Sequence, residues 1–114
     1  MSEIDIGISI ADAELTSYCY SDEDKKKLII HVRSWNEKII NFEFCDFILF
    51  LDRGTQYISE FCRNTEETEL FKQSLERTYM NVPEDHPYKL FQFLDLDGDP
   101  CLEIVCEHFS HKIL

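Results

Sequence analysis

The sequence predicts an α+β fold in which a mainly antiparallel β-sheet packs against one main α-helix, within a single domain spanning residues 1–114. Three observations support this prediction. Short segments rich in aromatic and β-branched residues lie at both ends of the chain. One amphipathic segment, residues 64–83, separates them. The dipeptide Asp97-Gly98 lies between alternating apolar residues, which is a strong hairpin signal.

The first strands are predicted at residues 14–20 and 27–35, because both segments have the composition of strands. The charged run SDEDKKK at 21–27 is the predicted hairpin tip between them. Before them, isoleucine occupies every second position from 4 to 10. This period-two pattern is typical of an edge strand, but it also suits a loosely held N-terminal arm. Both interpretations remain open at this point.

The pairing of the next strand follows from keeping apolar residues on one face. Placing Val32 opposite Phe42 and Ile30 opposite Phe44 satisfies that condition and predicts a three-residue connection, residues 36–38. Residues 47–51 are then apolar on both faces, as expected of a central strand that is covered on both sides. A further strand is predicted at 55–61.

The predicted cover is a helix within residues 64–83. Asn64 or Thr65 can cap its N-terminus, and Pro83 ends it. Its early carboxylates suit the positive end of the helix dipole. The residues expected on its buried face are Phe71, Leu75, Thr78, Tyr79 and Val82.

The loop DLDGDP resembles a calcium loop but fails at the positions that define one. An EF-hand numbered from Asp95 would need glycine where Pro100 stands and glutamate where Cys106 stands. A type I′ turn at Asp97-Gly98 accounts for the same residues. That turn pairs Phe93 with Leu102 and Phe91 with Ile104. We therefore expect a turn and no metal.

The opposite face of this hairpin would present a mixture of aromatic and acidic side chains, namely Tyr88, Gln92, Glu103 and Glu107. Interfaces favour tyrosine and use charge for orientation, so this is a candidate partner-binding face. An ordinary solvated sheet surface, or a face covered by another element, fits the same residues.

Charge is the strongest compositional feature, because 23 acidic residues against 11 basic ones leave a net charge of -12. Such a surface repels phosphate backbones and acidic membranes and attracts basic proteins. Simple solubility is the alternative. No apolar run reaches the roughly 18 residues that span a bilayer, and no secretory signal is apparent, so we expect a cytoplasmic protein.

The sequence offers little evidence for catalysis or for a cofactor. We expect all five cysteines to be free thiols, as in a reducing compartment. A zinc site is not expected, because the spacing of the candidate ligands matches no recognised pattern; these are Cys101, Cys106, His108 and His111. A cysteine–histidine nucleophile has no local support in so acidic a chain. Trp35 is expected to close the end of the core, and the alternative is that it anchors a partner.

Three segments resemble the pattern of small acidic immunity proteins from bacterial contact-dependent inhibition and polymorphic toxin systems. They are WNEK at 35–38, FEFCDF at 42–47 and HPYKLFQFLDLDGDPCLEIV at 86–105, and the similarity spans residues 27–107. The resemblance implies a non-enzymatic antitoxin that neutralises a cognate toxin domain, often a nuclease.

A basic nuclease would be attracted to an acidic inhibitor, whose carboxylates would stand where phosphates bind. The expected partner is thus a basic cognate toxin, with no nucleic acid, membrane or cofactor. Three surfaces could bind it: the hairpin face above, the hairpin tip (Asp95, Asp97 and Asp99) and the start of the helix (Glu66, Glu67 and Glu69). A regulatory or scaffold binding domain, or a small hydrolase, is the alternative. Oligomeric state is not predicted.

Overall fold

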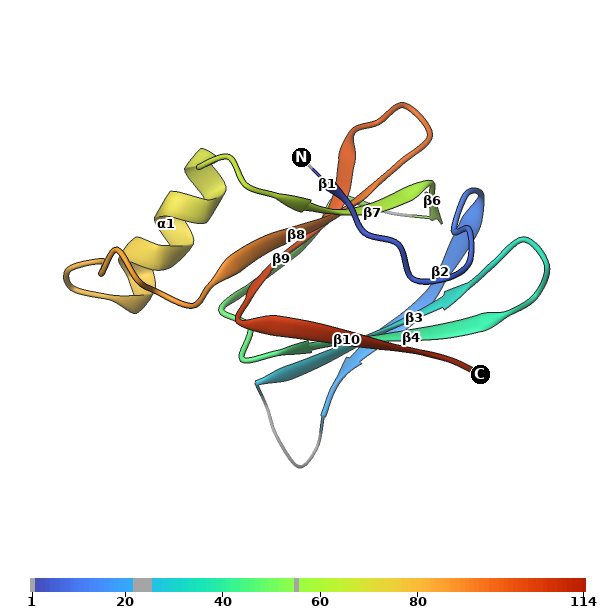
Figure 1. Ribbon diagram of the computed structural model, residues 1–114, viewed down its shortest axis with the longest axis horizontal. Helices are drawn as coiled ribbons and strands as arrows, with labels where there is room; N and C mark the ends of the chain where they lie inside the picture. The colour runs from blue at the N-terminus through green and yellow to red at the C-terminus, as the bar shows by residue number, and fades with distance from the viewer. Residues whose placement is uncertain (1, 22–25, 55) are drawn as a thin grey trace.

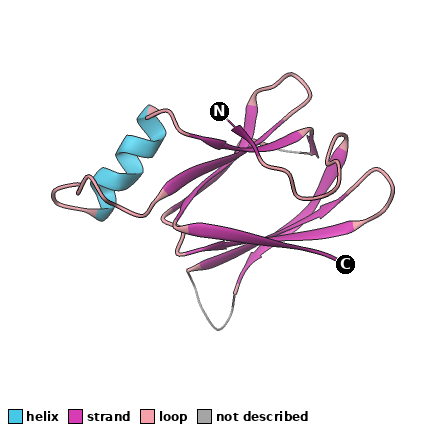
Figure 2. Cartoon of the chain, in the orientation of Figure 1, coloured by secondary structure: helices cyan, strands magenta, loops and turns pink. Residues whose placement is uncertain are grey.

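The computed structural model consists of two antiparallel sheets that face each other, with one short helix at their side (Figures 1 and 2). The structure describes residues 2–21, 26–54 and 56–114. Sheet A contains, in spatial order, β1 (Ser2–Glu3), β7 (Glu60–Asn64), β8 (Lys89–Leu94), β9 (Pro100–Cys106) and β5 (Leu49–Asp52). Sheet B contains β10 (His108–Ile113), β4 (Ile39–Cys45), β3 (Lys27–Arg33), β2 (Ala13–Tyr20) and β6 (Tyr57–Ile58). The helix is α1 (Glu69–Thr78).

The main core lies between the two sheets. Alternate residues of β3 and β4 point inward from sheet B and are fully buried, as Ile30 and Phe42 illustrate. Sheet A contributes Phe61 and Phe93, whose ring centroids are 4.6 Å apart. Antiparallel strands and, among the described residues, one helix are confirmed. The helix does pack on one sheet, but the larger cluster of buried apolar residues lies between the two sheets, so the protein is richer in β-structure than expected.

Asp46 and Glu107 mark two of the points at which the chain passes from one sheet to the other. Asp46 follows β4 of sheet B with a φ of 56°, a left-handed conformation that aspartate tolerates, and β5 of sheet A begins shortly after it. Glu107 stands between β9 of sheet A and β10 of sheet B. The two crossings are adjacent, since the amide of Glu107 donates to the carbonyl of Cys45.

Because of the crossing at Asp46, residues 47–51 do not form a central strand as expected. β5 is an edge strand that pairs only with β9 among the described residues. Its apolar character on both faces has another cause: Phe50 packs against the core between the sheets, whereas Leu49 packs with the residues beneath the helix.

The pairing of β3 with β4 differs from the predicted register by two residues. Ile30 lies opposite Phe42 and Val32 opposite Ile40, so the predicted faces are retained while the partners change. The connection keeps the predicted length of three residues but lies at 35–37 rather than 36–38, since the amide of Ser34 donates to the carbonyl of Lys38 and closes the loop there. Trp35 lies in this connection and is 70% exposed, so the expectation that it closes the core is wrong.

The N-terminal isoleucines form an arm rather than a long strand. Only Ser2–Glu3 pairs in β-fashion, with β7. Beyond it, Ile6 and Ile10 are buried in the main core, and the amide of Ile4 donates to the carbonyl of Phe61. The arm passes from sheet A to sheet B (Figure 1).

Two other predicted strands change at their ends. Residue 55 of the strand expected at 55–61 lies outside the described residues, and the rest is divided between β6, which pairs with β2 in sheet B, and β7 of sheet A. Strands β2 and β3 pair as a hairpin, as expected. Residues 22–25 of its tip lie outside the described residues.

The pairing of β8 with β9 is confirmed, with Phe91 opposite Ile104 and Phe93 opposite Leu102. The turn itself is not type I′, because Gly98 has a positive φ of 82° and Asp97 does not. The amide of Gly98 donates to the carbonyl of Asp95. This arrangement is a three-residue loop with a glycine bulge, the next most common hairpin connection.

The helix is shorter than predicted. Thr68, rather than Asn64 or Thr65, caps it by accepting a hydrogen bond from the amide of Phe71. The helix ends at Thr78, before Pro83. Phe71 and Leu75 pack on the outer face of sheet A, against side chains of β8 and β9. Among the described residues, no helix has the length and apolar character needed to cross a membrane.

Candidate functional site: an acidic groove beside the helix

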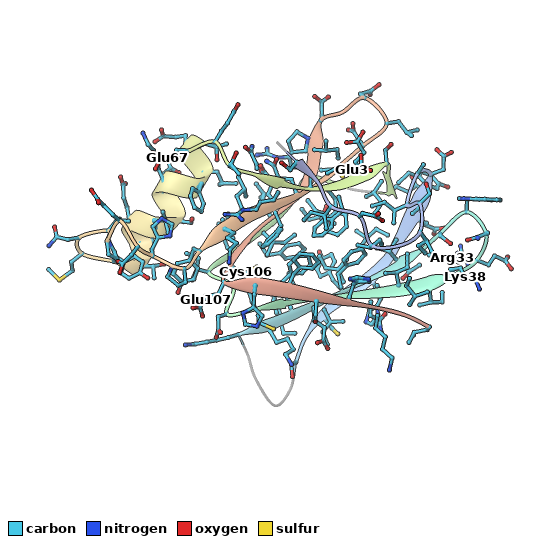
Figure 3. The ribbon with its side chains drawn as sticks, in the orientation of Figure 1. Glu3, Arg33, Lys38, Glu67, Cys106 and Glu107 are labelled. Atoms are coloured by element: carbon cyan, nitrogen blue, oxygen red, sulfur yellow. The ribbon has the colours of Figure 1, made fainter. Side chains whose placement is uncertain are left out.

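A groove of about 350 Å³ runs between α1 and the segment that follows it, and we call it the acidic groove. Glu67 lies just before the helix and is labelled in Figure 3. The groove is lined by Glu67, Lys72, Leu75, Glu76, Val82, Pro83, Glu84 and His86.

Aromatic contacts hold the return segment, residues 80–88, against the helix. The rings of Phe71 and His86 meet edge to face with centroids 5.8 Å apart, and those of Tyr79 and Tyr88 are 6.1 Å apart. The amide of Tyr88 donates to Nδ1 of His86. Because these rings are packed, the opposite wall of the groove is in place before any partner arrives.

The groove combines negative charge with an apolar floor. Three exposed carboxylates, those of Glu67, Glu76 and Glu84, line the groove together with one lysine, Lys72. The floor includes the buried side chain of Leu75. A long cationic side chain of a partner could lay its methylene groups on this floor and its charge among the carboxylates.

Further features suited to contact lie in the same region. Glu66 and Glu69 are exposed on either side of the capping segment. Met80 is fully exposed, at 102%, in the turn that leads to Val82. Exposed methionine is an adaptable apolar contact at binding surfaces. All three residues of the predicted helix-start surface therefore lie at or beside the groove.

The hairpin tip brings together Asp95, Asp97 and Asp99, whose carboxylate oxygens lie within 4.8 Å of one another. Oδ1 of Asp95 accepts hydrogen bonds from the amides of Asp97 and Asp99, at 2.9 and 3.0 Å. The carboxylate of Asp95 thus stabilises the turn, as aspartate does in Asx-turns. The tip remains an exposed acidic surface, separate from the groove.

The predicted hairpin face is not a single exposed surface. Gln92 and Glu103 are buried at 2% and 4% exposure, joined by a hydrogen bond of 2.6 Å from Nε2 of Gln92 to Oε1 of Glu103. Arg53 pairs with the other carboxylate oxygen of Glu103 at 2.9 Å. In this structure, these two side chains belong to an internal polar network and are not presented to a partner.

The other two residues of that face lie at the sheet crossing. Tyr88 is half-buried, and burial raises the pKa of its hydroxyl. Glu107 (Figure 3) shares a hydrogen bond with the side chain of Asp46. That hydrogen bond is the main reason why the pKa of Glu107 lies above its ordinary value of 4.5, and desolvation adds to it.

This carboxyl pair gives a prediction for the dependence of stability on pH. Because the pKa of Glu107 is raised in the folded state, the folded protein binds more protons than the unfolded protein does. The contribution of Glu107 to stability is therefore present below pH 4.5 and is lost as pH rises through the folded-state pKa. We expect Glu107→Gln to be more stable than the wild type at pH 7 but not at pH 4, measured by urea unfolding. Glu66→Gln removes the same charge elsewhere, and an identical pH profile for the two variants would contradict the prediction.

The candidate zinc ligands do not form a cluster. Among the described residues, the aspartate tip is the only group of three or more potential ligands close enough to share an ion. The thiol of Cys106 donates toward the carbonyl of His108 at 3.6 Å, and the thiol of Cys101 donates to the carbonyl of Phe93. None of the five cysteines, all of which lie in the described part of the chain, forms a disulfide bond, as expected.

Sequence reasoning missed Glu76, Glu84 and Met80. Helical spacing places Glu76 four residues after Lys72 on one side of the helix, a signal that was present in the sequence. The position of Glu84 depends on how the return segment folds back, which no local pattern shows.

Comparisons with known protein families, curated proteins and solved structures find no match to this chain.

Proposed function

We propose that this protein is a non-enzymatic inhibitor that neutralises a cognate toxin domain by binding a basic region of it in the acidic groove. The observation that carries this proposal is the convergence of three carboxylates, from three different segments, around an apolar floor. Ring contacts hold the return segment, which carries Glu84, against the helix without a partner. Preorganisation of this kind lowers the entropic cost of binding.

Overall charge supports a basic partner. A net charge of -12 accelerates encounter with a positively charged protein at low salt, and nucleases carry positive charge to hold phosphates. In the bound state, lysine or arginine side chains that would otherwise contact nucleic acid are paired with Glu67, Glu76 and Glu84. The inhibitor then competes with the nucleic acid for the same cations.

Co-expression with the product of the neighbouring gene tests the proposed partner. We expect that product to arrest growth alone, and we expect this chain to restore growth and form a complex that weakens as salt rises. A regulatory or scaffold protein with another partner would give neither rescue nor complex with that product. In that case the groove should still retain a basic protein from lysate.

The proposed surface is tested by reversing its charges. We expect Glu67→Lys, Glu76→Lys and Glu84→Lys together to weaken the complex by about one to two orders of magnitude, chiefly through loss of favourable charge contacts. Binding is measured by calorimetry at two salt concentrations, and folding by circular dichroism.

The matched control carries the same change in net charge on the hairpin tip and its neighbouring strand, as Glu60→Lys, Asp97→Lys and Asp99→Lys. We expect this control to lose only the long-range attraction, so its effect should be small and should disappear at high salt. Equal losses in both triple variants would show that net charge alone matters. A larger loss in the control would move the binding surface to the tip.

A further inference from the structure

On the outer face of sheet B, three side chains from three neighbouring strands form a chain of contacts. His31 on β3 lies directly opposite Asn41 on β4, and Nδ1 of His31 is 2.6 Å from Oδ1 of Asn41. On the other side, Nε2 of His31 is 3.9 Å from Sγ of Cys19 on β2. This face is remote from the acidic groove, which lies over the outer face of sheet A.

The short contact with Asn41 determines what the imidazole presents to the thiol. An amide oxygen accepts hydrogen bonds only, so Nδ1 of His31 must carry the proton that it donates to Oδ1 of Asn41. In neutral imidazole the other nitrogen, Nε2, then holds a lone pair, and this nitrogen faces Cys19. The arrangement is therefore an oriented base next to a thiol, with a third residue that holds the base, which is the general pattern of an activated nucleophile.

Cys19 also differs from the buried cysteines in exposure. Burial raises the pKa of Cys62 to about 11 and that of Cys106 to about 12, so both thiols keep their protons. Cys19 is exposed to solvent.

Charged side chains of both signs share the face of the sheet that carries Cys19. One of them, Arg33, is paired with Glu14 at 2.7 Å. The strand registers place Glu14, Lys27, Arg33, Glu43, His108 and Lys112 on this face.

We propose that Cys19 is a site of S-thiolation, at which the thiol exchanges with a low-molecular-weight disulfide and His31 transfers the proton. Nε2 of His31 takes the proton from Sγ of Cys19, and the thiolate attacks one sulfur of the disulfide. The disulfide bond breaks as the new S–S bond forms, and the leaving thiolate takes the proton from Nε2. Cys19 is oxidised, the leaving sulfur is reduced, and His31 returns to its starting state.

Attack on sulfur suits this surface better than acyl transfer does. Displacement at a disulfide proceeds through a mixed disulfide and develops negative charge on the leaving sulfur, where the protonated His31 can neutralise it. Acyl transfer would additionally need hydrogen-bond donors aimed at an oxyanion. Cys19 and His31 are sufficient for the first reaction, with Asn41 as a positioning residue.

The test uses the full-length reduced protein and bis(2-hydroxyethyl) disulfide, which is uncharged and so insensitive to the acidity of the chain. Intact mass and peptide mapping should show one adduct, at Cys19, at early times. We expect His31→Gln to slow its formation about tenfold. His111→Gln, on β10, is the matched control and should react at the wild-type rate.

Two substitutions of Asn41 separate a role in orienting His31 from a purely structural role, because the rate of adduct formation should differ between them. Asn41→Asp retains an oxygen acceptor for Nδ1 and should react within about twofold of the wild type, whereas Asn41→Leu should resemble His31→Gln. Circular dichroism checks that each variant is folded. If His31→Gln does not fold, the comparison of Asn41→Asp with Asn41→Leu tests the role of His31 instead. An unchanged rate in His31→Gln or Asn41→Leu, or a first adduct at another cysteine, would overturn the proposal.

Discussion

Replacement of Phe93 by alanine is expected to lower the free energy of unfolding by about 3–5 kcal/mol. Phe93 is fully buried, and its ring meets rings from both sheets: that of Phe61 at 4.6 Å and that of Phe42 at 5.1 Å. The substitution removes a large apolar side chain and leaves a cavity at the point where the sheets are joined. A loss of this size is a large part of the stability of a typical domain, about 5–15 kcal/mol.

Urea unfolding followed by circular dichroism measures this loss. Fluorescence is a poorer probe, because Trp35 is 70% exposed in the folded protein. Leu96→Ala, at the exposed hairpin tip, is the control and should change stability by less than about 0.5 kcal/mol. A Phe93→Ala protein whose stability is within about 1 kcal/mol of the wild type would show that the aromatic core between the sheets is not what holds the fold together.

The parts of the fold that could be predicted from sequence are those with local determinants. The β8–β9 pairing follows from alternating apolar residues around a glycine turn. The turn type differs from the predicted one, but Phe93 still lies opposite Leu102 as predicted. In the β3–β4 pairing the same alternation correctly assigned the buried faces. It did not determine the register, because a shift of two residues preserves every face.

The two-sheet arrangement could not be predicted in the same way, because it depends on short connections between strands. The pattern changes at Asp46, but such a change does not show which sheet the next apolar segment joins, and the same holds at Glu107. A continuous apolar run such as 47–51 indicates burial on both faces but does not identify what covers each face. Here the opposite sheet covers one face and the helix covers the other.

In the candidate site, too, some residues could be predicted from local sequence and others could not. Glu66, Glu67 and Glu69 could be found because helix starts favour acidic residues. Gln92 and Glu103 looked exposed because polar residues on a strand usually face solvent. Their burial depends on Arg53, which lies 50 residues away from Glu103 in sequence and supplies the ion pair.

The buried contact between Gln92 and Glu103 gives the second large expected effect on stability. Gln92→Leu should lower the free energy of unfolding by about 2–3 kcal/mol, because the buried carboxylate of Glu103 loses the hydrogen bond from Nε2 of Gln92. The loss of the weaker contact between Asn64 and Gln92 adds to the cost. Gln73→Leu, on the exposed side of the helix, makes the same chemical change and should have little effect.

The double variant Gln92→Leu/Glu103→Leu is expected to be more stable than Gln92→Leu alone. Replacing both partners leaves two leucines opposite each other on a covered face, and no buried carboxylate lacks a donor. Arg53 is 54% exposed, so its guanidinium can turn to water when its partner is lost. Urea unfolding of the wild type, both single variants and the double variant gives the coupling energy. A double variant no more stable than Gln92→Leu would mean that the cost of that substitution arises from packing rather than from an unsatisfied charge.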